Sequence, residues 1–182
     1  MKILIYGLGS CIALILYDGI AKLSAMTHIY LPKSSIGYFE ENFPQKHADT
    51  AVMDLLNQMI KSGAKKENIK ACIFGGATIF KESYSDMGER NSESVKNELK
   101  SLNIKIEREF IGGRKGSTII FDVKNKIVLL PNLNKKIKIW NIFVLELIIN
   151  SSINKAQINI KITISKTKVT YFADSSLTLW IL

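Results

Sequence analysis

The sequence predicts an α+β fold in which mixed or antiparallel β-sheet layers are flanked by two main helices. Three observations support this fold class. Two apolar runs meet at Asp18-Gly19, and such a dipeptide between apolar runs is the strongest short-range signal for a β-hairpin. Segments 48–62 and 92–102 carry apolar residues at the spacing of an amphipathic helix. Several short apolar runs later in the chain have the length of strands.

Length and composition indicate one soluble globular core. The chain has 182 residues, of which 47% are hydrophobic and 23% are charged. Its formal net charge of +9 favours acidic partners. The lysines are scattered, and the interleaved aromatic and basic pattern of a nucleic-acid binder is missing, so we expect no nucleic-acid partner. No apolar run reaches the roughly 18 residues that span a bilayer, so we expect no membrane insertion.

The two cysteines differ in their sequence context. A pair of cysteines makes no disulfide framework, which favours a reducing, cytoplasmic location. Cys72 lies inside an apolar strand, 69–74, and is predicted to fill the core. Cys11 instead follows a glycine-rich turn and begins an apolar run, where a cysteine can serve as a nucleophile.

The predicted first hairpin relates Cys11 to His28. A short strand, 3–6, leads into the glycine turn, and a two-residue turn at Asp18-Gly19 would place Cys11 opposite Met26. Because side chains alternate between faces, His28 then shares the face of Cys11, with β-carbons about 7 Å apart. A thiol, an imidazole and a glycine turn that exposes backbone N–H groups are the components of a cysteine nucleophile site.

A purely structural interpretation of both residues remains open at this point. Cys11 could be a small core hydrophobe, and His28 could be a hydrogen-bonded residue at the end of a strand. The nucleophile interpretation depends on the turn, since a one-residue slip would place His28 on the opposite face.

The middle of the chain is predicted to contain the two helices. Segment 33–46 is read as a loop and 48–62 as a helix that ends at Gly63, with His47 on the surface beside its start. Strand 69–74 ends in a glycine pair. The polar segment 83–91 is read as a loop in which Asn91 or Ser92 caps the second helix, 92–102. Further strands are predicted at 104–110, 118–123 and 127–130. The first two are joined by a basic glycine turn, 112–116, which is read as a flexible hairpin loop, although it could also bind an anion or an acidic surface.

The character of the chain changes after Pro131. The later sequence is rich in Ile, Asn, Lys and Ser, and its segment 137–149 fits either a helix or a strand. Segment 156–164 alternates like a strand. We therefore divide the chain into a domain at 1–131 and a C-terminal extension of unknown role at 132–182.

Five short motifs occur in an order and at a spacing that resemble a known family. They are Leu8-Gly9-Ser10-Cys11, His28 followed by Leu31-Pro32, Ala48-Asp49, Phe74-Gly75-Gly76-Ala77 and Gly88-Glu89-Arg90-Asn91. Over roughly residues 3 to 130 this set resembles the CheD family of chemoreceptor glutamine deamidases. The resemblance implies a CheD-like cysteine hydrolase fold. It also implies hydrolysis of glutamine side-chain amides on methyl-accepting chemotaxis proteins, which yields glutamate and ammonia.

The resemblance also implies roles for individual residues. Cys11 would attack through a thioester, His28 would transfer the protons, and the turn at Gly9 and Ser10 would stabilise the oxyanion. No metal or organic cofactor is implied. The family usually has a threonine six residues before the cysteine, where this chain has Ile5, and such a change would reduce activity.

Two other functions are compatible with the sequence. A CheD-like module could bind receptors or a CheC-type phosphatase without turning over glutamine, and the apolar residue at Ile5 favours this reading. Alternatively, the start of the chain through Cys11 resembles a lipoprotein signal with a lipidated cysteine. That signal would be shorter than the usual ~15 to 30 residues, and the apolar sequence continues past the cysteine.

Overall fold

The computed structural model describes residues 2–34, 44–79, 86–139 and 180–181. These residues form three layers: two helices, a five-stranded sheet in the order β5-β4-β2-β3-β9, and a four-stranded sheet in the order β1-β6-β7-β8. The elements are β1 (Lys2–Leu8), β2 (Ile12–Asp18), β3 (Leu23–Ile29), α1 (Ala48–Lys61), β4 (Ile69–Gly75), α2 (Met87–Ser101), β5 (Lys105–Ile111), β6 (Ser117–Asp122), β7 (Ile127–Leu130), β8 (Lys135–Lys138) and β9 (Trp180–Ile181). The predicted α+β class is confirmed.

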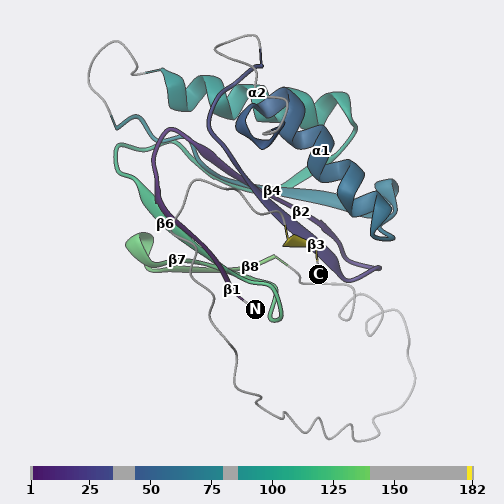
Figure 1. The fold of residues 1–182 in the computed structure, drawn as a ribbon. Helices are drawn as coiled ribbons and strands as arrows, with labels where there is room; N and C mark the ends of the chain where they lie inside the picture. The colour runs from purple at the N-terminus through teal and green to yellow at the C-terminus, as the bar shows by residue number, and fades with distance from the viewer. Residues whose placement is uncertain (1, 35–43, 80–85, 140–179, 182) are drawn as a thin grey trace, which may run out of the picture.

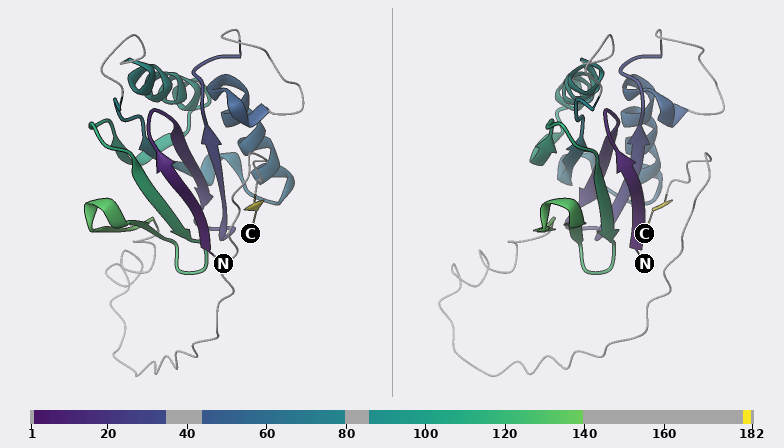
Figure 2. Two further views of the ribbon diagram at one scale, coloured as in Figure 1. Left: turned by 60° about the vertical axis from the view of Figure 1, so that its left-hand side comes forward. Right: turned by 90° about the vertical axis from the view of Figure 1, so that its left-hand side faces the viewer.

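The five-stranded sheet lies between the two helices and the four-stranded sheet (Figure 2). An apolar core covers each of its faces. All seven residues of β2 are buried, because alternate side chains enter alternate cores. The helix-side core is formed with α1 and α2 and includes Ile12, Leu14 and Leu16 of β2. The inter-sheet core is formed with the second sheet and includes Ala13, Ile15 and Tyr17.

The helices cover one face of this sheet. In α1 the predicted apolar stripe is buried except for Ile60, which is 42% exposed. Gly63 follows the end of the helix with a φ of +104°. In contrast, α2 begins at Met87 and not at Ser92, so residues 87–91 are helical and their prediction as a loop was wrong. The residues buried near the start of α2 are small or polar, which leaves no apolar signal in the sequence.

The predicted two-residue turn between β2 and β3 was wrong. The strands pair from Asp18 with Leu23 to Ile12 with Ile29, which leaves a four-residue loop at 19–22. The Asp18 carboxylate organises this loop, because its Oδ1 accepts hydrogen bonds from the backbone N–H groups of Ile20 and Ala21 at 2.8 and 2.9 Å.

The basic glycine loop at 112–116 also differs from its prediction. It joins β5 of one sheet to β6 of the other, so it is a crossover between sheets and not a hairpin. The reason is pairing: β5 pairs parallel with β4, whereas β6 pairs antiparallel with β1. The chain makes a second crossover between the sheets at residues 9–11, between β1 and β2.

The chain beyond Pro131 is described only in part. β8 pairs with β7 at one edge of the four-stranded sheet, and β9 pairs with β3. The predicted segment 156–164, and segment 137–149 beyond residue 139, lie outside the described residues. The division of the chain at residue 131 stays a prediction. Among the helices of the described residues, none combines the length and apolar character needed to span a membrane.

Candidate active site

The turn that carries Cys11 is held by backbone hydrogen bonds to the end of β4. The carbonyl of Gly9 accepts from the N–H of Ala77 at 2.8 Å, and the carbonyl of Cys11 accepts from the N–H of Gly76 at 2.9 Å. Both donors belong to the segment that contains the glycine pair. The position of the predicted nucleophile is therefore fixed against the central sheet.

Only glycine fits at both positions of that pair. Gly75 and Gly76 have φ values of +109° and +66°, which L side chains rarely adopt. A β-carbon on Gly75 would collide with the Cys11 carbonyl oxygen, and one on Gly76 would lie 2.9 Å from the carbonyl oxygen of Gly88. The glycine pair thus lets α2 and the nucleophile turn approach the same short stretch of backbone.

Asn91 binds the nucleophile turn from the side of α2. Its side chain is fully buried, and its Nδ2 donates hydrogen bonds to the backbone carbonyls of Ser10 and Tyr30, both at 2.9 Å. Ser10 precedes Cys11, and Tyr30 lies two residues after His28. The predicted capping role of Asn91 was wrong, because this residue lies inside the helix and faces the strands.

The strand register places His28 on the inter-sheet side. His28 lies opposite Ala13, a member of the inter-sheet core, and Cys11 packs against the same core. The four-residue loop shifts the register so that, counted on from Ile12 opposite Ile29, Cys11 comes opposite Tyr30 and not Met26. This shift moves each partner by an even number of residues, so the face of His28 is the same as in the predicted hairpin.

The imidazole of His28 lies in an apolar, stacked environment. Its ring stacks on that of Tyr30, with centroids 4.3 Å apart and an interplanar angle of 29°. Its Nε2 is buried and has no hydrogen-bond partner among the described residues. Burial lowers the pKa of His28 to about 4, because the charged form loses solvation. The ring is therefore neutral at pH 7.

The thiol of Cys11 is half-buried, and burial raises its pKa. Its own backbone N–H and the side chain of Ser10 act in the opposite direction, since hydrogen bonds to sulfur favour the thiolate. The resting site accordingly contains a neutral thiol and a neutral imidazole, and the thiol needs a base to become a nucleophile.

Cys72 is buried in the inter-sheet core, as predicted for core filler. Burial raises the pKa of its thiol to about 12, which makes it unreactive at neutral pH. Only Cys11 of the two free cysteines is partly accessible.

No hydroxyl replaces the threonine of the resembled family at position 5. Ile5 lies in β1 opposite Ile119 and packs against the inter-sheet core. The nearest threonine in sequence to His28 is Thr27, which lies opposite Leu14, a residue of the helix-side core. Its side chain therefore faces away from the side that His28 occupies.

The segment after His28 is held by the start of α1. The N–H groups of Tyr30 and Leu31 both donate to the carbonyl of Lys46 at 3.0 Å, and the N–H of Ala48 donates to Leu31 at 2.9 Å. His47 pairs with Leu31 in a β-bridge and is 1% exposed, so its predicted surface position was wrong. The bridge lies immediately before the first residue of α1.

The same segment is held again by polar side chains. The carboxylate of Asp49 accepts from the backbone N–H and the hydroxyl of Ser34, at 3.0 and 2.7 Å. The hydroxyl of Ser94 in α2 donates to the carbonyl of Pro32. Among the described residues, no group of three or more His, Cys, Asp or Glu side chains is placed to hold a metal ion.

Comparison with known proteins gives consistent matches. A family model described as CheD chemotactic sensory transduction matches residues 30–132, a range that begins just after His28. A Clostridium botulinum (strain Hall) protein named probable chemoreceptor glutamine deamidase CheD is 46% identical over 136 residues, covering 72% of this chain and 83% of that protein. A Methanococcus vannielii protein of the same name is 38% identical over 130 residues, covering 70% and 83%.

Proposed function

This chain belongs to the CheD family, and from this premise we propose that it is a chemoreceptor glutamine deamidase that uses Cys11 and His28. The proposal is carried by one observation. A half-buried thiol and a neutral imidazole share one face of the sheet, beside a turn whose carbonyls are held by Gly76, Ala77 and Asn91. The substrates would be specific glutamines on methyl-accepting chemotaxis proteins.

In the proposed reaction, His28 takes the proton of the Cys11 thiol as the sulfur attacks the side-chain carboxamide carbon. Backbone N–H groups of the turn at Gly9 and Ser10 would stabilise the oxyanion. His28 then protonates the departing ammonia, which leaves a thioester on Cys11. Water attacks the thioester with His28 as base, and the products are glutamate and the free thiol.

The pKa shifts of the two groups fit a neutral starting pair. A neutral imidazole can accept a proton, and the thiolate charge that forms beside it would stabilise the imidazolium. The absence of a partner for Nε2 among the described residues leaves this nitrogen available for the transfer. Catalytic hydrogen bonds of this kind often shorten only when substrate is bound.

The test is ammonia release from a purified chemoreceptor cytoplasmic fragment. We expect release by the wild-type chain and none by Cys11→Ala. Cys72→Ala is the matched control: it removes the other thiol from the inter-sheet core and should retain activity once folding is verified. Mass spectrometry should find a gain of about 1 Da at each target glutamine, the difference between an amide and a carboxylic acid. Release that survives in Cys11→Ala would contradict the proposal.

A second candidate function is a module that docks on receptors or a CheC-type phosphatase without turnover. It is favoured by the apolar side chain of Ile5, which cannot orient an imidazole. If the wild-type chain binds a receptor fragment or phosphatase and releases no ammonia, this function replaces the first.

The lipoprotein alternative is less compatible with the fold. Cleavage before Cys11 would remove β1, which pairs with β6 from Lys2 to Leu8 and carries part of the inter-sheet core. Detection of intact Met1 in the native protein would exclude this alternative and would be consistent with a cytoplasmic protein.

A further inference from the structure

A pocket of about 820 Å³ opens next to the nucleophile turn. Its wall includes Gly75 and Ala77, together with the crossover loop at 112–116. Ala77 bonds to Gly9, and Gly75 lies directly against the carbonyl of Cys11. One wall of the pocket is thus the same backbone that holds the candidate nucleophile.

The crossover loop is fixed to that backbone. The N–H of Gly112 donates to the carbonyl of Gly75 at 2.8 Å, and the N–H of Thr78 donates to the carbonyl of Gly113 at 2.9 Å. At the other end of the loop, Gly116 lies beside β1, and a β-carbon there would be in ordinary van der Waals contact with the carbonyl oxygen of Leu8, at 3.6 Å. The loop therefore has a defined place beside the site.

All the charged side chains that line the pocket are positive. Its charged lining residues, Arg114, Lys115 and Lys135, are all basic and all exposed. None of the three forms an ion pair with a described residue, and Lys135 instead lies 5.2 Å from the centroid of the Phe110 ring. The ion pairs of the described residues lie elsewhere, for example Lys96 with Glu109 at 3.0 Å.

We propose that this basic pocket binds acidic side chains that flank the target glutamine on the receptor surface. The proposal rests on the proposed function, because the pocket adjoins the turn that would bind the glutamine. Unpaired cations at the rim of a site attract a partner of opposite charge and select against neutral or basic surroundings. The pocket would thus contribute to the choice of glutamine, whereas Cys11 and His28 would perform the chemistry.

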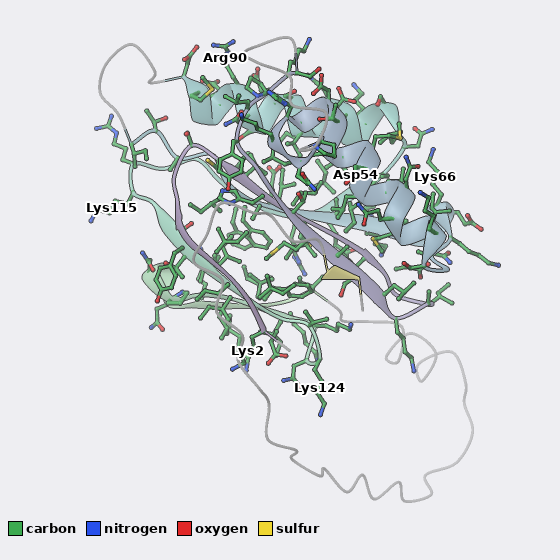
Figure 3. The ribbon with its side chains drawn as sticks, in the orientation of Figure 1. Lys2, Asp54, Lys66, Arg90, Lys115 and Lys124 are labelled. Atoms are coloured by element: carbon green, nitrogen blue, oxygen red, sulfur yellow. The ribbon has the colours of Figure 1, made fainter. Side chains whose placement is uncertain are left out.

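A charge-reversal pair tests this role. The variant Arg114→Glu/Lys115→Glu is compared with Lys65→Glu/Lys66→Glu, which has the same change in net charge on exposed residues. Figure 3 shows Lys115 and Lys66 at opposite sides of the molecule. Both variants and the wild type are assayed for ammonia release from a receptor cytoplasmic fragment and for direct binding to that fragment, each at low and at physiological salt.

We expect the loop variant to raise KM and Kd by roughly fivefold to twentyfold, with kcat nearly unchanged. The control should stay within about twofold, and the salt dependence of binding should shrink only in the loop variant. Equal effects in the two variants would overturn the proposal.

The outcome for this pocket is separable from that for the proposed function. If the wild type releases ammonia and the loop variant has no selective effect, the proposed deamidase function stands and the proposed role of the pocket is wrong. If the wild type binds the receptor fragment without releasing ammonia, and only the loop variant loses this binding, the pocket is a receptor contact and the proposed deamidase function is wrong. A wild-type chain that neither binds nor releases ammonia rejects both.

Discussion

The side-chain amide of Asn91 donates a 2.9 Å hydrogen bond to the backbone carbonyl of Ser10, the residue before the candidate nucleophile. The same amide nitrogen donates to the carbonyl of Tyr30, just beyond the strand that carries His28. One buried side chain of α2 therefore holds the backbone just before Cys11 and two residues after His28. Its contacts identify Asn91 as a structural support of the site. Asn91 lies 81 residues after Ser10 in the sequence, so no local motif could reveal this contact.

Substitution of Asn91 by Leu should destabilise the fold and abolish ammonia release. The change leaves two backbone carbonyls without their donor, at a cost of about 2 to 4 kcal/mol in the free energy of unfolding. Urea denaturation measures this cost. Asn97→Leu, at an exposed position of the same helix, is the control and should change stability by less than about 0.5 kcal/mol. Equal stability of the two variants would contradict the role of Asn91.

Substitution of Ile5 by Thr should increase kcat for deamidation by about tenfold, because a hydroxyl on this strand could orient the imidazole of His28. The change should also shift the acidic limb of the pH–rate profile to higher pH, because a hydrogen bond from the imidazolium to the hydroxyl stabilises the protonated form of His28. Ile3→Thr is the matched control, because Ile3 lies on the same strand and packs against the same core. A similar gain in both variants would argue against orientation of His28.

The stability of the protein should depend on pH through His28. Its pKa is about 4 when folded against 6.5 as the ordinary value, so the unfolded chain binds the proton more readily between these values. The contribution is fully present above pH ~6.5 and is lost as the pH falls toward ~4, by about 3 kcal/mol in all. Urea titrations at pH ~6.5 and ~4 measure the free energy of unfolding. Its loss between these two pH values should be smaller in His28→Gln than in the wild type by about 3 kcal/mol. Identical losses in the two proteins would rule out the burial effect.

Alkylation should distinguish the two thiols in the native protein. Iodoacetamide should modify Cys11, which is partly accessible, and leave the buried Cys72 intact. Because burial raises the pKa of Cys11, its modification should be slow at pH 7 and accelerate as the pH is raised. Peptide mass spectrometry over time gives both rates. Rapid modification of Cys11 at pH 6 would indicate a preformed thiolate and would contradict the neutral resting pair.

Most strands and the first helix could be predicted because their apolar side chains have a clear period. The runs at 69–74 and 127–130, for example, correspond to β4 and β7 almost residue for residue. The face shared by Cys11 and His28 was also predictable, since alternation tolerates any even shift of register. Their catalytic roles stay predictions.

The supports of the site could not be predicted from the same patterns. Buried residues near the start of α2, such as Gly88 and Asn91, are small or polar, so periodicity gave no reason to place them in a helix. The burial of His47 depends on a bridge to Leu31, a contact that hydropathy does not encode. The crossover at 112–116 looked like a hairpin because a glycine loop has the same composition whether it joins one sheet or two.

The burial of β2 on both faces has a consequence for hydrogen exchange. Amides of this central strand are bonded on both sides, to β3 and β4, and are covered by both cores, so they should exchange only when the whole domain opens. Cys11 immediately precedes this strand. The candidate nucleophile is therefore attached to the strand that unfolds last. Local fluctuations at the exposed Tyr6 or in the loop at 112–116 would leave the hydrogen bonds of β2 intact.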